Sequence, residues 1–493
     1  MIKSQYKISF VVFLFAGLLL LQSCSDFLEQ EPGTKISITE QLSTKQGVLT
    51  ALNGVYSNLE ANLRGERFAV YADLQGGNLK FSPNKVTSSS KGVIAIPTNI
   101  ANVYSFDDQS ADSDFESFYN ESYDIINQCN LILEFTDALT DAGTTEKNQI
   151  KAEALTIRAY THFLLAEVYS QNYGYTENAS HFGIIYKTKS ILQGLEYPAR
   201  KTAAETYSLI ISDLKNALEL YSSSSFLTGP SYSFFSAAST KALLARVYLS
   251  KHDWQNAYDI ADDVIKNSGV NLVATENYLA EWEKPNVPIS EVLLEFSIPK
   301  DASGAIGGSL SAFFGYVNTT SYGDYVASQD LLGLYGTSDI RKNLFLVQPL
   351  STLVNDVQVN RNYSFTKKFQ DNPGYVAFRL SEQYLIRAEA ALKLQNINQA
   401  KTDINIIRAR ANATLLSDSE NLEEALFLER RKELCFEGHL FFDIARNKKN
   451  VQRNDGCISN NCQMNYPSLK YVLPIPLANK NLNSNLVQNE SYN

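Results

Sequence analysis

A histidine near a carboxylate is the arrangement in this sequence that most resembles an acid–base catalytic pair. Glu437 precedes His439 by two residues, and the chain contains four histidines in all. The neighbouring segment, from Glu429 to Glu433, is dense in acids and bases. A structural ion-pair network therefore explains these residues better than a catalytic pair does.

Motifs of the common hydrolases and nucleotide-binding enzymes are absent from the sequence. It contains no HExxH, no GxSxG, no P-loop and no dinucleotide-binding fingerprint. The sequence therefore predicts a protein with no enzymatic activity and no cofactor. A glycosidase with two catalytic carboxylates is the enzymatic alternative, although no pair of acids stands out from the acids on helix surfaces.

An acidic run could in principle supply oxygen ligands to calcium. It contains Asp107, Asp108 and Asp112, followed closely by Asp114 and Glu116. The run lacks the glycine and the terminal glutamate of an EF-hand loop. A solvated loop that leads into a helix is the better interpretation, and calcium remains the weaker alternative.

Five cysteines divide into three groups. Cys129 and Cys435 lie on apolar helical faces, which predicts that both are buried. Cys457 and Cys462 flank a polar loop, where a local disulfide fits an exported protein. A zinc site does not fit, because no histidine lies nearby.

The fifth cysteine, Cys24, ends an apparent secretory signal. Lys3 and Lys7 precede an apolar stretch, residues 8–21, that is too short to span a bilayer. The sequence Leu-Gln-Ser-Cys at 21–24 resembles a bacterial lipobox, which implies cleavage before Cys24 and lipidation of that residue. An ordinary signal peptide with a chance cysteine is the alternative.

Length and charge restrict the function further. The chain has 493 residues and a net charge of −10, and removal of residues 1–23 takes away two lysines and no acid. This acidic balance argues against nucleic acid as a partner.

Two helical hairpins with the same spacing organise the chain. Ala388 and Ala400 are twelve residues apart within 381–412, and Ala245 and Ala257 have the same offset within 236–268. Small residues at this spacing are typical of the crossing helices of a tetratricopeptide (TPR) repeat. Hydrophobic periodicity predicts further helices at 39–63, 114–139, 146–170, 202–221 and 421–447. Residues 64–113 and 269–378 are expected to be mostly irregular insertions with a few short strands, one of them near 291–298.

An ordered set of short motifs extends over nearly the whole mature chain. It contains Ala152-Glu153-Ala154, Arg387-Ala388-Glu389, Glu437-Gly438-His439 and Leu473-Pro474-Ile475-Pro476. With the lipobox, these motifs resemble the SusD/RagB family of surface lipoproteins from Bacteroidetes nutrient-uptake systems. Asp26 and Glu29 also resemble the acidic surface-export signal of such lipoproteins.

The resemblance implies a mostly α-helical, TPR-like scaffold with large loop insertions. We expect a signal peptide at 1–23, a lipidated cysteine and tether at 24–38, and a single domain at 39–493. The implied function is to bind an oligosaccharide at the outer membrane and deliver it to a SusC-like TonB-dependent transporter. The RagB branch implies an oligopeptide as the alternative ligand, and a TPR scaffold for protein partners is a further alternative.

The resemblance also implies that ligand binds to loops away from the TPR hairpins. The loops at 71–81, 101–108 and 311–325 fit this description, and we expect them to form one site. Aromatic rings can stack on sugar rings and amides can bind hydroxyl groups. The candidate residues are Tyr71, Asn78, Phe81, Tyr104, Phe106, Trp282, Phe313, Tyr316, Tyr322 and Tyr325. For any single one of these residues, burial as loop packing is the better interpretation than ligand contact.

The lipobox generates the first prediction. Cys24→Ala removes the thiol that would carry the lipid, so we expect the variant to be released from the outer membrane as soluble protein. Membrane fractionation and surface proteolysis of intact cells measure this result. Recovery of the parent protein only from the periplasm would contradict the surface location.

Overall fold

Two helical hairpins form where the alanine spacing predicts them. The first contains α9 (Ala237–Ser250) and α10 (Trp254–Asn267), and the second contains α14 (Leu380–Lys393) and α15 (Ile397–Arg410). All four alanines at the crossings are fully buried, as expected for helices that approach closely. The chain leaves the first hairpin for more than a hundred residues, yet α10 packs against α14, so the two hairpins are neighbours in space.

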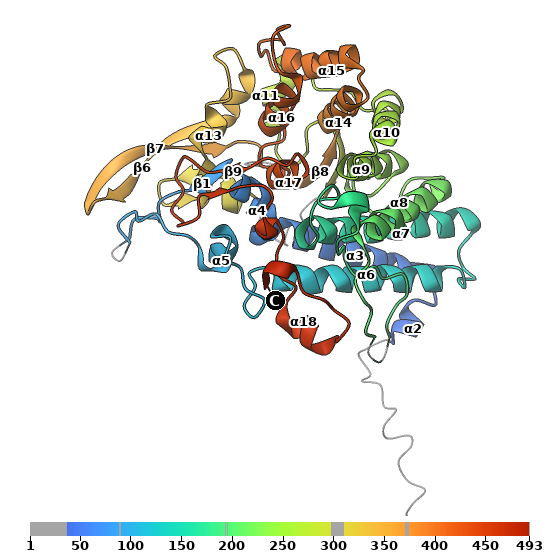
Figure 1. Cartoon of the computed structure of the whole chain (residues 1–493). Helices are drawn as coiled ribbons and strands as arrows, with labels where there is room; N and C mark the ends of the chain where they lie inside the picture. The colour runs from blue at the N-terminus through green and yellow to red at the C-terminus, as the bar shows by residue number, and fades with distance from the viewer. Residues whose placement is uncertain are drawn as a thin grey trace, which may run out of the picture.

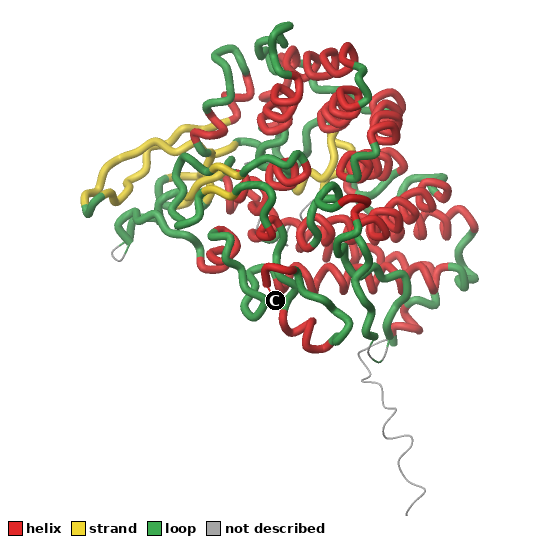
Figure 2. Tube along the Cα trace, in the orientation of Figure 1, coloured by secondary structure: helices red, strands yellow, loops and turns green. Residues whose placement is uncertain are grey.

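The computed structural model describes residues 37–87, 90–192, 194, 196–296, 310–369 and 374–492. The predicted signal peptide, Cys24 and most of the predicted tether lie outside these residues. Figures 1 and 2 show a mostly helical molecule in which most strands lie on one side, whereas β8 lies among the helices. Within the described chain, no helix is long and apolar enough to cross a membrane.

The remaining predicted helices also form, with three corrections. Their bounds are α2 Ile38–Gln41, α3 Lys45–Arg64, α6 Glu116–Thr136, α7 Thr144–Tyr169, α8 Ala203–Leu220, α16 Leu422–Glu433 and α17 Leu440–Arg446. The single helix predicted over 39–63 is two helices, because residues 42–44 form a turn and the Thr44 side chain caps the start of the second. The prediction of one helix over 421–447 is wrong, because Phe436 and Gly438 adopt left-handed backbone conformations between α16 and α17. The prediction that 64–113 is irregular is also wrong in part, because α4 (Glu66–Gly76) follows α3 after a break at Gly65.

Short helices and five two-stranded antiparallel sheets make up much of the rest of the described chain, and all of them except the last helix and the last sheet lie in the insertions. The sheets pair β1 (Leu79–Phe81) with β5 (Tyr325–Ala327), β2 (Val292–Phe296) with β8 (Tyr375–Arg379), β3 (Tyr316–Asn318) with β4 (Ser321–Tyr322), β6 (Phe345–Val354) with β7 (Val357–Thr366), and β9 (Val451–Gln452) with β10 (Gln463–Met464). The short α-helices are α5 Ala101–Tyr104, α11 Tyr278–Trp282, α12 Leu310–Phe314, α13 Gln329–Leu332 and α18 Leu477–Leu482. The strand expected near 291–298 is confirmed as β2.

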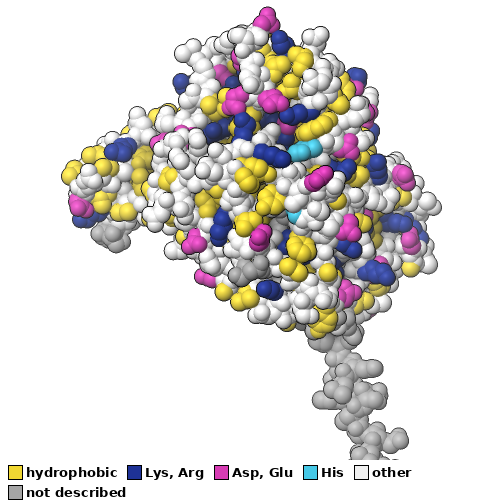
Figure 3. Space-filling view, viewed as in Figure 1, with side chains coloured by type: hydrophobic (Ala, Val, Ile, Leu, Met, Phe, Trp, Pro, Cys, Tyr) yellow, Lys and Arg dark blue, Asp and Glu magenta, His cyan; other side chains and the backbone are white. Residues whose placement is uncertain are grey.

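The hairpin of β6 and β7 was not predicted, although the sequence contains a signal for it. Asn355 and Asp356 join the two strands, and both have a positive φ, as a tight hairpin turn requires. The hairpin projects from the body as an arm (Figure 1). Hydrophobic side chains are exposed on it (Figure 3), including Val347 at 54% and Val357 at 60%.

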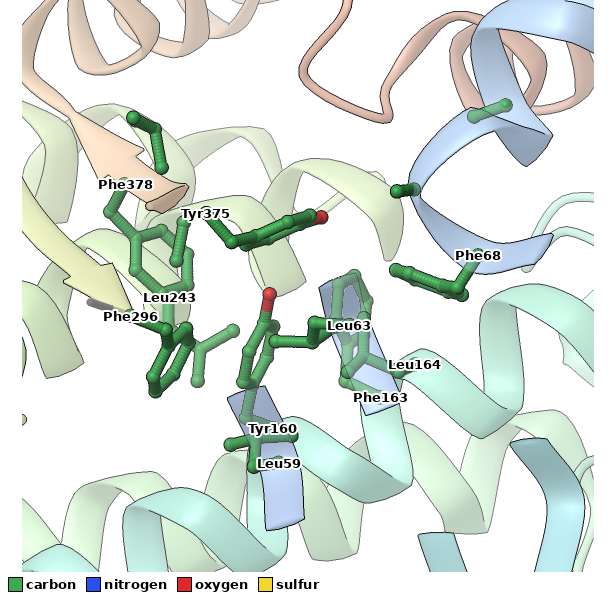
Figure 4. Close-up of a cluster of buried hydrophobic side chains, with 14 of the residues drawn as sticks. Leu59, Leu63, Phe68, Tyr160, Phe163, Leu164, Leu243, Phe296, Tyr375 and Phe378 are labelled. Atoms are coloured by element: carbon green, nitrogen blue, oxygen red, sulfur yellow. The ribbon is translucent and has the colours of Figure 1, made fainter. Parts of the chain in front are cut away.

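A large apolar core joins the helices to the sheet of β2 and β8. Figure 4 shows the part of this core where Leu59 and Leu63 of α3 meet Tyr160 and Phe163 of α7. Phe378 of β8 lies 5.5 Å from Tyr160 between ring centroids. The core therefore extends from the first helices of the chain to the segment that leads into the second hairpin.

A buried network of ion pairs links the insertion at 269–378 to the second hairpin and α16. Its centre is Glu433, the last residue of α16, whose carboxylate accepts hydrogen bonds from Arg341, Arg379 and Arg410. Burial alone would raise the pKa of Glu433, but these arginines hold it well below its usual range. The carboxylate is therefore ionised in the folded protein.

The network generates a prediction about stability. Glu433→Ala leaves three buried guanidinium groups without their shared acceptor, so we expect a loss of about 3–5 kcal/mol in unfolding free energy. Urea unfolding followed by circular dichroism measures this loss. The control is Asp418→Ala, which removes an exposed partner of Lys401 and should cost at most about 1 kcal/mol. Equal shifts in the two variants would show that the network does not stabilise the fold as proposed.

Candidate functional site

The three loops expected to form one site do lie together. Strand β1 pairs with β5, so that Phe81 faces Tyr325 across the ladder. The ring of Tyr104, at the end of α5, meets Phe81 edge-on at a centroid distance of 4.9 Å. In Figure 1 these elements lie on the side of the molecule from which the β6–β7 arm projects.

Seven of the ten candidate side chains are buried in this arrangement, which is the outcome that the sequence favoured for any single one of them. They are Tyr71, Asn78, Phe81, Tyr104, Trp282, Tyr322 and Tyr325. The rings of Phe81, Tyr104 and Tyr325 pack on one another and hold the loops in place. Their role in this conformation is to support the surface, because solvent does not reach their faces.

Three of the buried candidates have other specific partners. Tyr71 belongs to α4, where its ring packs 4.9 Å from that of Phe115. Asn78 donates to Asp73 at 2.6 Å and accepts from Arg431 at 2.8 Å. Trp282 lies beneath the buried ammonium of Lys368, which is 5.0 Å from its ring centroid. These contacts therefore stabilise the fold around the three residues.

Tyr322 belongs to a small satellite cluster under the arm. Its ring lies parallel to that of Tyr316 at 6.4 Å, and both rings approach Phe365 of β7. Its hydroxyl donates to the backbone oxygen of Pro83. The cluster leaves Tyr316 partly exposed, whereas Tyr322 is covered.

The partly exposed candidates are Phe106, Phe313 and Tyr316, which we call the arm-side rings. Phe106 has a φ of 54°, an unusual conformation for a residue with a bulky side chain. The guanidinium of Arg453 lies 4.7 Å from the Phe106 ring centroid and 4.2 Å from that of Tyr104. The guanidinium of Arg453 thus contacts both the partly exposed ring of Phe106 and the buried ring of Tyr104.

The loop closed by Cys457 and Cys462 also borders this surface. Its position there was not predicted from the sequence. The two cysteines form a disulfide, and Asn461 within the loop donates to the backbone oxygen of Ser105 at 2.8 Å. Asn461 is exposed and Ile458 is 42% exposed. The sequence signal was an Asn- and Ser-rich loop closed by cysteines, but its position beside residues 101–108 arises only in the folded chain.

The acidic run starts a helix and does not gather into a metal site. Asp108 accepts hydrogen bonds from the hydroxyl of Ser113 and the backbone nitrogen of Asp114. Burial raises the pKa of Asp108 to about 6. Over the residues that the structure describes, no group of three or more His, Cys, Asp or Glu side chains could hold a metal ion, so the calcium alternative through Asp107, Asp108 and Asp112 has no support here.

The pairing of Glu437 with His439 does not form. Both oxygens of Glu437 are engaged by Arg379, and one of them also accepts from Lys368 at 2.7 Å. Burial, with Arg246 and Arg430 nearby, holds the pKa of His439 well below its usual range. Glu437 thus belongs to the structural network that the sequence favoured.

Comparison with known proteins shows similarity to SusD and SusD-like proteins. The family model described as "SusD family" matches residues 349–492, and the model described as "Starch-binding associating with outer membrane" matches residues 26–249. SusD-like protein P2 of Formosa agariphila is 25% identical to this chain, over 98% of this chain and 99% of the relative. The starch-binding protein SusD of Bacteroides thetaiotaomicron is 36% identical, but over only 23% of this chain and 21% of the relative.

Solved structures show a similarity that covers most of the chain. The crystal structure of a putative sugar binding protein from Bacteroides vulgatus superposes with a TM-score of 0.76 at 27% identity. The superposition covers 92% of this chain and 99% of the other. The similarity therefore extends over both hairpins and the insertions around them.

The contrast between buried and exposed rings generates a prediction about stability. Tyr104→Ala opens a cavity between Phe81 and Arg453, so we expect it to lower the unfolding free energy by about 3–5 kcal/mol. Tyr316→Ala removes a partly exposed ring and should cost about 1 kcal/mol. Thermal and urea unfolding of both variants measure the difference. Equal losses would mean that the Tyr104 ring does not support the loops.

Proposed function

Because this chain belongs to the SusD-like family, we propose that it binds a carbohydrate at the cell surface and has no catalytic activity of its own. In this proposal the ligand is an oligosaccharide. The protein then passes it to a SusC-like TonB-dependent transporter in the outer membrane. The family description "Starch-binding associating with outer membrane" supports both the ligand class and the location.

The observation that carries the proposal is the surface around the arm-side rings. Phe106 and Tyr316 present partly exposed rings that buried aromatic neighbours hold in place. Sugar rings have C–H faces that pack against aromatic rings, and their hydroxyl groups pair with amides such as the exposed Asn461. A preformed surface of this kind loses little conformational entropy when it binds ligand.

The anchor in this proposal is the lipid on Cys24. Its support is the sequence at 21–24 together with the outer-membrane association in the family description. The anchor would hold the binding surface close to the transporter, so that released ligand meets the transporter at high local concentration.

One feature of the arm favours an oligopeptide as the second candidate ligand. Strand β7 pairs with β6 alone, so its other edge has no strand partner among the described residues. The second half of β7 is buried and packs near β5, so the accessible part of this edge is at residues 357–362. An open edge can bind an extended peptide through backbone hydrogen bonds. The exposed Val357, on β7 itself, would contact an apolar side chain of such a peptide.

The proposed function generates a prediction about binding. Phe106→Ala and Tyr316→Ala each remove a stacking surface, so we expect each to weaken oligosaccharide binding about tenfold. The measurement is calorimetric titration with maltoheptaose and a panel of other oligosaccharides, with chromatography to check that they stay intact. Tyr197→Ala is the control, because Tyr197 is an exposed tyrosine outside these loops.

Two outcomes would contradict this proposal. If short peptides bind and no oligosaccharide does, the second candidate replaces the first. If an oligosaccharide is cleaved and one carboxylate substitution stops the cleavage, the protein is an enzyme.

A further inference from the structure

A hollow of about 480 Å³ lies where the ends of four helices meet, away from the arm-side rings. It is bounded by the start of α10, the end of α14, the start of α16 and the end of α17. We call it the hairpin hollow and define it by His252, Trp254, Lys393, Asn421, Glu424 and Lys448. Figure 1 shows α10 and α14 on the side of the molecule away from the β6–β7 arm.

An aromatic pair forms one wall of the hairpin hollow. The rings of His252 and Trp254 are stacked with centroids 4.9 Å apart and planes inclined by 16°. The turn that holds them places His252 in a left-handed conformation with a φ of 61°. Burial and the nearby Arg446 lower the pKa of His252 to about 4, so this wall is uncharged at neutral pH.

Trp254 is notable because the chain contains only two tryptophans. The other one, Trp282, is buried beneath Lys368 and Arg379. Trp254 is partly exposed and lines the hairpin hollow. The tryptophan that solvent can reach is thus at the hairpins and not on the expected binding loops.

The rim of the hollow combines hydrogen-bond donors and acceptors. Lys393 pairs with Glu423 at 2.7 Å and Lys449 pairs with Glu424 at 2.5 Å. These pairs are on the surface, where an ion pair contributes little stability and can exchange for other partners. Lys448 is exposed, has a φ of 54°, and has no ion-pair partner among the described residues.

This combination of groups matches the chemistry of a carbohydrate. A sugar residue presents an apolar face to an aromatic wall and hydroxyl groups that both donate and accept hydrogen bonds. The rim supplies ammonium donors and carboxylate acceptors within one concave space. A purely apolar ligand would leave these polar groups without partners, and a highly charged one would meet charge of both signs.

We propose that the hairpin hollow is a second carbohydrate-binding site, which takes one or two sugar residues against the His252–Trp254 wall. This inference rests on the proposed function, since it assigns the same class of ligand to a separate place. Two weak contacts on one polymer raise the overall affinity when a single chain reaches both.

The test uses the full chain and the fluorescence of its tryptophans. We expect maltoheptaose to change the emission of Trp254, while the buried Trp282 contributes a constant background. Lys448→Ala should weaken the binding seen by fluorescence about fivefold to tenfold. Lys215→Ala is the matched control, because Lys215 is an exposed lysine on α8 outside the hollow.

A second pair of measurements separates the two sites. Phe106→Ala should weaken the calorimetric binding at the arm-side rings and leave the fluorescence titration unchanged. If maltoheptaose binds calorimetrically but leaves the emission of the parent unchanged, and Lys448→Ala titrates like the parent, the second site is wrong and the proposed function stands. If neither maltoheptaose nor any other oligosaccharide of the panel binds at either place, both are overturned.

Discussion

The carboxylate of Glu433 is the point on which the rest of the structure depends. It accepts hydrogen bonds from arginines of three separate segments: Arg341 before β6, Arg379 at the end of β8 and Arg410 at the end of α15. Other buried acids, among them Glu291 and Glu429, balance the remaining positive charge. A buried charge without a partner is very unfavourable, so none of these segments can dock alone without a large desolvation cost. The network therefore joins the long insertion to the second hairpin in a single cooperative arrangement.

The same arrangement positions the candidate binding surface. After α16, the left-handed residue Phe436 turns the chain so that Glu437 reaches Arg379 and Lys368. The next residue, Gly438, donates its backbone N–H to Asp73 of α4. Asp73 in turn holds Asn78, which leads directly into β1. A chain of buried polar contacts thus runs from the network to the base of the exposed rings.

Local patterns in the sequence were sufficient to predict the hairpins but not the burial of the candidate rings. The alanine spacing at 388 and 400 determines which residues can lie at a close helix crossing, and this depends only on residues within one hairpin. Tyr104, in contrast, is covered partly by Arg453, almost 350 residues later in the chain. No local pattern contains that contact. The loops lie together because β1 pairs with β5 and Tyr104 packs on Phe81, and these contacts, like the burial of the rings, join residues far apart in the sequence.

The packing of the hairpins restricts where this protein can recognise a ligand. Ala245, Ala257, Ala388 and Ala400 bury the facing sides of the helices, so those helix faces have no room for another molecule. Recognition groups must then lie on loops or at helix ends, where side chains can be held in place without being covered. The arm-side rings satisfy this condition on the loops, and the His252–Trp254 pair satisfies it at the helix ends. A scaffold whose rigidity comes from its interior can therefore carry two separate binding surfaces, since neither of them contributes much to its stability.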